Sequence, residues 1–496
     1  MKNKKKIFAV FICMLLVLTG FGKSYAKGET SSVVNDGVID LGTSADFPPY
    51  EYYEGDKIVG IDVDIMAAIS EYLGYEVKFH DMEFNNIIAS IESNKLDGGM
   101  SGFTVTEERK KSVNFTEPYA KSEQRVLLKK DSEIKTLDDI RGKTIGTQLG
   151  TTGDMFARDD FGEENVQAFS KYSDAVLALQ NGKLDCIILD DQTAVKFADA
   201  NADLTLLDAP YAEEDYAIAV NKGNEALLND FNEAIKALKA DGTIDTIIAK
   251  YTQSDEEEGK QYSGIIGKIQ NNLINGKNYT YLLEGLKTTI IVTIFALIIG
   301  LVLGILIAII RTSAKELDPS LKSAKGFFLK FIDKLAGLFV TIIRGTPTTI
   351  QLLILFNVFL VNLDNLRLVA IIAFGLNSAA YMSELFRGGL QAVDKGEKEA
   401  ARSLGLSYWQ TLKKVVLPQG FKFSLPALGN EVITLFKETS ISGFIGLVDL
   451  TRGASIIISK TFQAAIPYFA AALIYLVIVL VLEQIFKKLE RNYDYA

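Results

Sequence analysis

The chain has 496 residues, more than one compact domain ordinarily holds, and a formal net charge of −10 at pH 7. This acidic balance argues against nucleic acid as a partner, because phosphate neutralisation requires a basic face. With one histidine, His80, and two cysteines, the sequence predicts neither a metal site nor a disulfide framework. The mean hydropathy is +0.17, but the long apolar runs gather after Gly285. We therefore expect a polar first half and a membrane-spanning second half.

Residues 1–26 have the pattern of a secretory signal peptide. Four lysines among the first six residues precede an apolar run over 7–21, and Ser24-Tyr25-Ala26 offers small residues before the expected cleavage point. An uncleaved anchor is the alternative that these residues allow. In either case the segment that follows is expected outside the cytoplasm.

Residues 38–251 alternate between strand-like and helix-like patterns. Short β-branched runs are found at 38–42, 144–147, 186–189 and 217–220. Helical periodicity separates them, for example over 63–73 and 226–238. Such alternation predicts parallel α/β sheets with helices on their faces, in which ligands bind beyond the carboxyl ends of the strands.

The residues that follow these runs form several ordered motifs. Residues 42–51 read GTSADFPPYE, residues 96–109 read LDGGMSGFTVTEER, and residues 115–119 read FTEPY. RGKTIG at 141–146 and LGTT at 149–152 follow. Together the motifs resemble the polar amino-acid binding proteins of ABC importers, the family of glutamine-, histidine- and lysine/arginine-binding proteins. The resemblance implies a bilobed α/β substrate-binding domain of two doubly wound lobes over residues 38–251.

A free amino acid offers a carboxylate and an ammonium, and the sequence supplies a partner for each. Arg109 can hold the carboxylate with a planar, bidentate fork. Asp190, at the end of the 186–189 run, would take the ammonium, although its neighbour Asp191 could do so after a one-residue shift. The resemblance implies an amino-acid site made of Ser44, Phe47, Phe84, Ser101, Gly102, Thr104, Arg109, Gln148, Thr151, Thr152 and Asp190.

The pocket for the ligand side chain leaves two substrates open. Phe47 and Phe84 match aromatics that sandwich this side chain in the family. Some relatives carry an aspartate where this chain has Ser44, and here Asp46 and Glu51 are the nearby acids. A cationic side chain requires such an acid, because an unpaired buried charge costs several kcal/mol, of the order of 3–5. The choice between glutamine and arginine or lysine therefore depends on whether Asp46 enters the pocket.

Residues 252–278 are interpreted as a linker and a pre-membrane segment, and residues 279–490 as an all-α permease domain. Five apolar runs are long enough to cross a bilayer: 285–310, 335–361, 368–386, 425–447 and 466–486. Lysines and arginines gather after the first, third and fifth runs, which predicts a cytoplasmic C-terminus and an extracellular binding domain.

Two motifs in this half resemble amino-acid ABC permeases, the family of histidine, glutamate, glutamine and arginine permeases. Arg344-Gly345-Thr346-Pro347 resembles a permease signature and is expected to end one helix and begin another at the inner face. Glu399-Ala400-Ala401, Gly405 and the VVLP at 415–418 have the spacing of a cytoplasmic coupling loop, here 394–418. A short helix over 398–404 would present small residues to an ATPase. The resemblance implies a type I importer.

Three ionisable residues, Glu431, Lys437 and Glu438, lie in or near the fourth run. Charged groups at such depth are costly and are functional candidates. They either line the translocation path or hold helices together.

The chain lacks a nucleotide-binding loop. Gly142-Lys143-Thr144 has Leu137 where a phosphate loop needs its first glycine. We therefore expect no cofactor and no enzymatic activity in this chain, with ATP used by a separate ABC ATPase subunit. The expected function is the binding and translocating subunit of a polar amino-acid importer in the bacterial plasma membrane, as a homodimer or paired with a similar permease. An amino-acid-gated channel or a sensor is the alternative.

Overall fold

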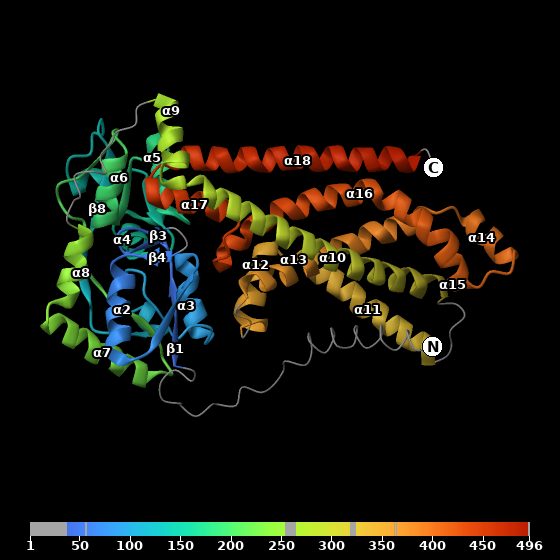
Figure 1. Ribbon diagram of the computed structural model, residues 1–496, viewed down its shortest axis with the longest axis horizontal. Helices are drawn as coiled ribbons and strands as arrows, with labels where there is room; N and C mark the ends of the chain where they lie inside the picture. Colours follow the sequence, from blue (N-terminus) through green and yellow to red (C-terminus); the bar gives the residue numbers. More distant parts are fainter. Residues whose placement is uncertain are drawn as a thin grey trace.

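The computed structural model describes residues 37–54, 57–252, 264–317, 324–361, 363 and 365–494. The predicted signal peptide, 1–26, and residues 253–263 of the predicted linker lie outside this part. Within it, a two-lobed α/β unit stands at one end of a long helical unit (Figure 1). The fold class predicted from the sequence is confirmed.

The first lobe is built on a five-stranded sheet in the order β5-β1-β6-β14-β7. β1 pairs in parallel with β5 and β6, whereas β14 runs antiparallel to β6 and β7. The strands are β1 (Val38–Thr43), β5 (Glu76–Asp81), β6 (Gly98–Gly99), β7 (Val113–Phe115) and β14 (Ala219–Asn221). The helices are α2 (Ile61–Leu73), α3 (Phe84–Glu92), α7 (Glu225–Ala240) and α8 (Thr243–Thr252). The core of this lobe forms where the apolar faces of α2 and α7 meet β1.

The second lobe has a sheet in the order β10-β9-β11-β8-β12, with β13 also paired to β8. Its strands are β8 (Ala120–Lys129), β9 (Ile145–Gln148), β10 (Val166–Phe169), β11 (Cys186–Asp190), β12 (Leu204–Leu206) and β13 (Ala212–Tyr216). Its helices are α4 (Thr152–Phe161), α5 (Tyr172–Gln180) and α6 (Asp191–Ala200). β11 is buried along its whole length, as expected for a strand covered on both faces.

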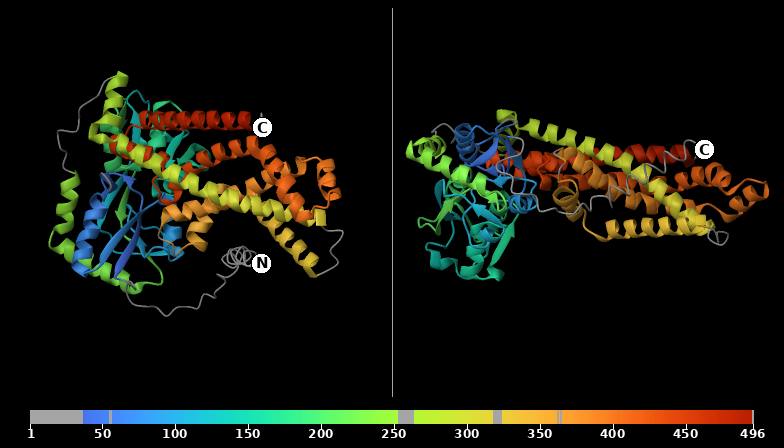
Figure 2. Two further views of the ribbon diagram at one scale, coloured as in Figure 1. Left: turned by 45° about the vertical axis from the view of Figure 1, so that its right-hand side comes forward. Right: turned by 90° about the horizontal axis from the view of Figure 1, so that it is seen from below.

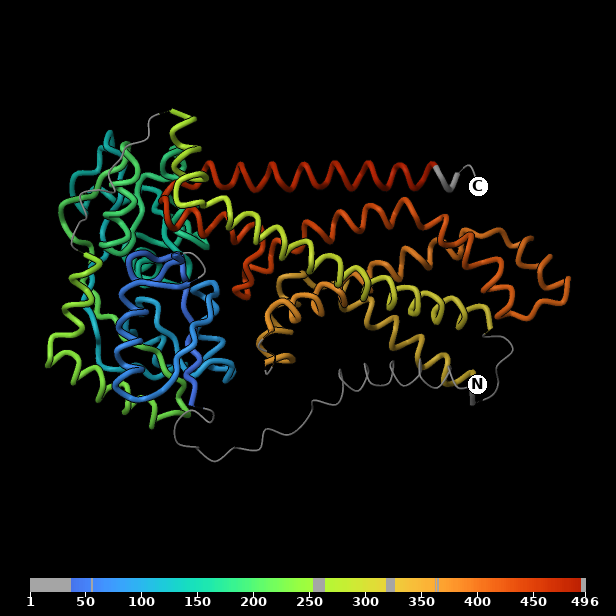
Figure 3. The backbone as a smooth tube through the Cα atoms, viewed as in Figure 1, coloured from blue at the N-terminus to red at the C-terminus, as the bar shows by residue number. Residues whose placement is uncertain are grey.

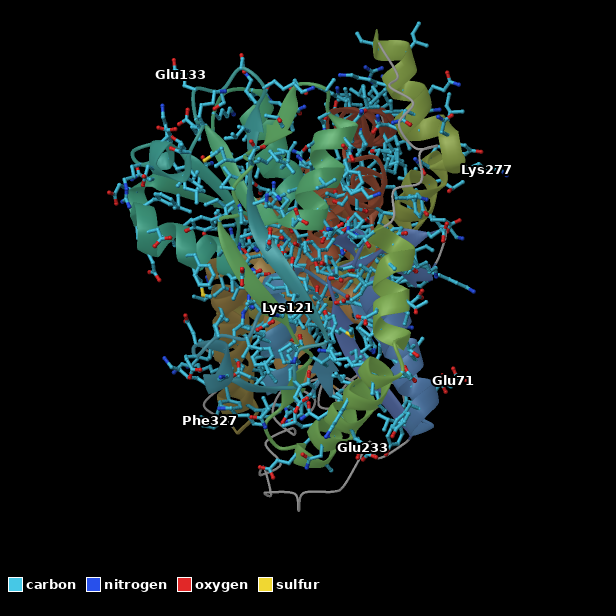
Figure 4. The ribbon with its side chains drawn as sticks, turned by 90° about the vertical axis from the view of Figure 1, so that its left-hand side faces the viewer. Glu71, Lys121, Glu133, Glu233, Lys277 and Phe327 are labelled. Atoms are coloured by element: carbon cyan, nitrogen blue, oxygen red, sulfur yellow. The ribbon has the colours of Figure 1, made fainter. Side chains whose placement is uncertain are left out.

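The chain passes between the lobes twice, between β7 and β8 and again between β13 and β14. Figure 4 views the end of the molecule opposite to the helical unit and shows Lys121, near the start of β8, at the centre of this face. A small antiparallel sheet of β2 (Asp46–Phe47), β3 (Glu51–Glu54) and β4 (Lys57–Val59) belongs to the first lobe. It lies on the side of that lobe that contacts the helical unit.

The helical unit begins with α9 (Gly264–Ile269) and is dominated by α10 (Tyr279–Leu317), α13 (Leu366–Ala392), α16 (Leu417–Glu438) and α18 (Ala465–Asp494). Shorter elements are α11 (Ala324–Gly345), α12 (Thr348–Ile354), η7 (Leu355–Phe359), α14 (Lys395–Ser403), α15 (Tyr408–Thr411), η8 (Leu412–Val416), η9 (Thr439–Ile445) and α17 (Leu450–Thr461). Figures 2 and 3 show α10 crossing the unit from the α/β end toward α14 and α15 at the far end. Glycines on α10 allow close packing, since a Cβ on Gly300 would lie 2.7 Å from Ser378 Oγ of α13.

Within the described residues, three helices are long and apolar enough to cross a membrane: Tyr279–Leu317, Leu366–Ala392 and Ala465–Arg491. A fourth crossing results if Tyr408–Ile445 and Leu450–Thr461, bent by 48°, count as one span. The three helices contain three of the five predicted runs, and the bent pair contains a fourth, 425–447, up to Ile445. The predicted span 335–361 is not one helix, because the chain breaks at Thr346-Pro347 between α11 and α12. Proline lacks an N–H group and drives the residue before it out of the helical region.

The two units are in direct contact through α17 and the loop before it. α17 touches β2 and β3 of the first lobe. Gly446, with φ +80°, lies so close to the first lobe that a Cβ there would be 1.5 Å from the carbonyl oxygen of Asp81. Leu352 of α12 shares an apolar cluster with Met82 and Ile87. The helical unit thus packs against the edge of the binding lobe nearest the cleft.

Candidate functional site

One cavity lies between the two lobes, and every residue predicted for the amino-acid site lines it. The space between atoms there amounts to about 360 Å³. The lining residues are Ser44, Asp46, Phe47, Phe84, Ser101, Gly102, Thr104, Arg109, Gln148, Thr151, Thr152, Tyr172 and Asp190. Residues up to Arg109 come from the first lobe and the others from the second. The side-chain candidate Asp46 is among them.

Arg109 is held in the cavity wall with its guanidinium group between the lobes. Nη1 donates to the carbonyl oxygen of Thr104 and Nη2 to that of Gly150, each at 2.8 Å. The group also lies over the rings of Phe84 and Phe103, at 5.5 and 5.4 Å from the ring centroids. Burial lowers the pKa of Arg109 to about 10, so the side chain is still a cation at neutral pH. A pre-positioned buried cation of this kind suits a carboxylate.

Asp190 ends β11 and is directed into the cavity, where it is buried. Its carboxylate accepts a hydrogen bond from Tyr216 Oη. Burial and the negative charge of Glu214 raise the pKa of Asp190 well above its ordinary value. An ammonium group beside it would supply the missing positive charge. Asp191, the alternative by a one-residue shift, instead pairs with Arg125 at 3.3 Å and does not line the cavity.

The two lobes supply different donors to the cavity. In the first, Gly102 adopts φ +53°, and a Cβ there would lie 2.9 Å from Cε1 of Phe47, so only glycine fits without displacement. In the second, Thr151 caps α4 by accepting from the N–H of Asp154 at 3.3 Å. The positive end of α4 therefore faces the cavity beside Thr152, which favours an anionic ligand group.

Asp46 belongs at once to the cavity and to a buried charge cluster, which we call the acid cluster. The acid cluster contains three carboxylates and two cations: Asp46, Asp81, Glu83, Lys171 and Arg452. Lys171 Nζ lies 2.8 Å from Asp46 Oδ2 and 3.6 Å from Glu83 Oε1. Burial would raise the pKa of Asp46, but Lys171 and Arg452 outweigh it and hold this pKa below its ordinary value. Asp46 is therefore an anion at the side-chain end of the cavity.

Sequence reasoning missed two residues of the second lobe, Lys171 and Tyr172, which follow β10. The rule that ligands bind beyond strand ends would have found them if the run 166–169 had been recognised as a strand. It also missed Asp81 and Glu83, which stand at the end of β5. These positions have no marker except their place after a strand.

A second cavity, of about 20 Å³, adjoins the first at the contact between the second lobe and α17. Asp46, Gln148 and Tyr172 line both cavities. The helical unit contributes Ser455, Ile458, Ser459 and Phe462 to the second cavity. Hydroxyl groups of α17 thus lie directly behind one wall of the interlobe cavity.

The Arg344-Gly345-Thr346-Pro347 motif forms the break between α11 and α12. Gln351 closes the break by donating from Nε2 to the carbonyl oxygens of Ile343 and Thr346, at 2.6 and 2.9 Å. The helix break is confirmed. Its expected place at the inner face stays a prediction, and it conflicts with the expectation of an extracellular binding domain, because the break lies on the side of the binding lobe. The break stands at the end of α11 remote from α14, and α12 packs toward the binding lobe (Figure 1).

The predicted coupling loop forms a separate helix, α14, at the end of the molecule opposite to the cavity (Figure 1). Asp394 caps it by accepting from the N–H of Gly396 at 2.6 Å, and Gly405 follows its end with φ +85°. Of the three motif residues before Gly405, Glu399 and Ala400 are exposed, and Ala401 packs inward. Leu404 and Trp409 are 82% and 58% exposed. This end therefore presents small and apolar side chains outward.

Glu431, Lys437 and Glu438 all lie on α16. Glu431 and Glu438 are seven residues apart, hence on one helix face, and both are half-buried. Lys437 is exposed on another face, so the adjacent Lys437 and Glu438 do not point the same way.

Comparison with known proteins agrees with this architecture. Residues 39–254 match the bacterial extracellular solute-binding proteins of family 3, and residues 324–495 match the binding-protein-dependent transport system inner membrane component. Over 255 residues the chain is 34% identical to the arginine-binding extracellular protein ArtP of Bacillus subtilis, covering 50% of this chain and 98% of ArtP. It is 34% identical to ABC transporter arginine-binding protein 1 of Escherichia coli, covering 47% of this chain and 96% of the relative.

A further relative is the ABC transporter glutamine-binding protein GlnH of Bacillus subtilis, 30% identical over 272 residues that cover 51% of this chain and all of GlnH. These relatives span only the binding half, and the inner membrane component accounts for the helical half. The chain is a transport subunit and not an enzyme. It belongs to the bacterial extracellular solute-binding proteins of family 3 and joins such a binding domain to an ABC-transporter permease domain in one polypeptide.

Proposed function

We propose that this chain is the substrate-binding and membrane-translocating subunit of an ATP-driven importer of polar amino acids. The observation that carries the proposal is the interlobe cavity, which holds a buried cation, Arg109, and a buried acid, Asp190, on its two lobes. These two groups are chemically complementary to the carboxylate and ammonium common to all amino acids. A permease domain in the same chain supplies a route onward.

We infer an arginine-class substrate with a cationic side chain. The acid cluster beside the cavity has three carboxylates, of which only Asp46 lines the cavity, and Lys171 is the cation that the binding domain itself provides. Two of the relatives compared above are arginine-binding proteins by name. The 2.8 Å contact of Lys171 with Asp46 favours glutamine as the second candidate, because Lys171 already neutralises this carboxylate.

The rest of the importer is also part of the proposal. A separate ATPase would dock on α14, where exposed Glu399 and Leu404 offer a charged and an apolar contact. The permease would pair with itself or with a similar permease. In support, α18 is apolar and only 11% of its spanning window is buried within the chain. The binding domain would lie outside the cell, and α14 and the C-terminus inside.

Transport in proteoliposomes tests the function. The chain is reconstituted in vesicles with its ATPase. These vesicles should take up radiolabelled arginine only when ATP is supplied on the side of the membrane where the ATPase lies. A gated channel would instead pass current without ATP, and such a result would contradict the proposal.

A thermal-shift screen of the protein with the common amino acids tests the substrate. A ligand at 100 times its Kd adds about 2.7 kcal/mol, so a shift of several degrees is expected with arginine. A shift with glutamine alone would select the second candidate.

A further inference from the structure

Arg452 of α17 extends from the permease domain into the binding domain. Its side chain is only 2% exposed. Nε donates to Asp81 Oδ2 at 3.1 Å, and Nη2 donates to Asp81 Oδ1. Nη1 lies 3.4 Å from Glu83 Oε1 and 3.6 Å from Asp46 Oδ2. A permease cation thus completes the acid cluster of the binding domain.

Asp46 connects the acid cluster to the ligand. Of the three carboxylates in the cluster, Asp46 alone lines the interlobe cavity. Its Oδ1 accepts a hydrogen bond from Ser44 Oγ at 2.9 Å. This bond holds the carboxylate at the boundary between the interlobe cavity and the acid cluster. Any cationic group that approaches Asp46 from the cavity meets an acid that Arg452 approaches from the opposite side.

The charge balance of the cluster depends on whether the two units are in contact. With Arg452 present, three carboxylates face two cations, Lys171 and Arg452. Without Arg452, they face Lys171 alone. Charges buried together in a low dielectric are strongly coupled, and an unmatched one costs several kcal/mol, of the order of 3–5. The undocked binding domain therefore gains more from a cationic ligand side chain than the docked one does.

We propose that Arg452 is a specificity and release residue. When the binding domain docks, Arg452 competes with the cationic side chain of a bound amino acid for Asp46. Docking therefore weakens the binding of that side chain. The proposal rests on the proposed function, because it takes an amino acid to be the ligand of the cavity. Because the two binding events are linked, a cationic ligand must lower the docking equilibrium constant by the same factor by which docking lowers the affinity for that ligand.

The second cavity lies on the permease side of Asp46 and, at about 20 Å³, has room for about one water molecule. It adjoins Asp46 and is lined on the permease side by Ser455 and Ser459, one and two helical turns beyond Arg452 on α17. Their two hydroxyl groups can accept hydrogen bonds from the N–H groups of a guanidinium or an amide. Arg452 and the two serines thus lie along one face of α17, beside Asp46.

A matched pair of probes separates charge competition from a merely structural ion pair. L-arginine and L-citrulline have nearly the same shape, but only arginine carries a side-chain charge. In the full chain in nanodiscs, Arg452→Gln should tighten arginine binding about tenfold, equal to 1.4 kcal/mol, and change citrulline binding less than about threefold. Arg452→Lys should keep the wild-type ratio of the two Kd values. Lys460→Gln, which removes another cation from α17, should leave the ratio unchanged. Equal changes for both probes in Arg452→Gln, or none, would overturn the proposal.

A docking assay, first without ligand, tests the role of Arg452 separately from the identity of the substrate. Ser90 Oγ of the first lobe lies 3.1 Å from Asn357 Oδ1 of η7, so Ser90→Cys with Asn357→Cys should form a cross-link when the units dock. Adding Arg452→Gln should lower the yield at least about fivefold, whereas Lys460→Gln should not. Arginine, but not citrulline, should lower the yield with Arg452 intact. Binding of neither probe would contradict the proposed function, whereas an undiminished yield in Arg452→Gln would overturn the role of Arg452 itself.

Discussion

At the binding-domain end of the molecule, charged side chains are buried and held by fixed partners, whereas at the α14 end the motif residues lie at the surface. Arg109 and Asp190 are almost completely covered, and each has a defined hydrogen-bond partner. Glu399, Ala400 and Leu404 project outward. Buried polar groups require such partners, while an exposed surface acquires its partner from another molecule. Substitutions at the binding-domain end should therefore change ligand affinity, whereas substitutions at the α14 end should change only the transport rate.

The largest expected effect is the loss of ligand affinity in Arg109→Ala, at the buried binding-domain end. It removes the buried cation that suits the ligand carboxylate, and truncating one partner of a buried charge pair costs about 2–5 kcal/mol. Ligand affinity should fall at least about 30-fold, measured by isothermal titration on the full chain. Arg158→Ala, which removes the two ion pairs of Arg158 with Asp154 and Glu163, is the control and should bind normally. Wild-type affinity in Arg109→Ala with an unchanged far-UV spectrum would remove Arg109 from the site.

Gly446→Ala should separate binding from transport at the contact between the units. A Cβ at Gly446 would lie 1.5 Å from the carbonyl oxygen of Asp81, so docking cannot proceed without displacement. Uptake should fall at least about tenfold, which corresponds to a coupling loss of about 1.4 kcal/mol. Ligand binding should be retained and, if Arg452 acts as proposed, should tighten for arginine but not for citrulline. Gly242→Ala is a matched control, because Gly242 also has φ +80° and nothing lies within 4 Å of its Cβ position. Equal losses in both variants would attribute the effect to backbone strain.

The exposed end should respond to Glu399→Ala and Gly405→Asp in transport alone. Neither residue contacts the cavity, so ligand affinity should not change. ATP-driven uptake and ligand-stimulated ATPase activity should fall about fivefold to tenfold, within the usual range for the coupling of two sites. Glu490→Ala, near the end of α18, is a charge-matched control. Unchanged uptake in both loop variants would show that α14 is not where the ATPase engages.

Sequence reasoning succeeded where the chemistry is local. The strand run 186–189 places Asp190 at a strand end, as the structure has it. The pattern before Gly405 predicts a short helix over 398–404, and the structure has a helix at Lys395–Ser403. It failed on β8, whose first half, with Lys121 and Glu123, has too little apolar alternation to read as a strand. It also missed the acid cluster, because Arg452 and Asp81 are 371 residues apart and only tertiary packing brings them together.

The smallest effect concerns Asp62, a buried carboxylate behind the cavity that accepts from Gly102 N at 3.0 Å and from Tyr119 Oη. Burial raises its pKa to about 6 from the ordinary 3.8. The folded domain therefore holds this proton more tightly than the unfolded chain, and the stability that Asp62 contributes is lost as pH rises from about 4 to 6. Asn at this position is neutral throughout, so the Tm of Asp62→Asn relative to wild type should rise across this window, at about 2–4 °C per kcal/mol. Glu71→Gln, on the exposed face of the same helix, should show no such trend. A flat difference in Tm between Asp62→Asn and wild type would mean that Asp62 stays ionised in the folded domain. The hydrogen bonds from Gly102, Tyr119 and Glu51 would then be enough to stabilise its charge.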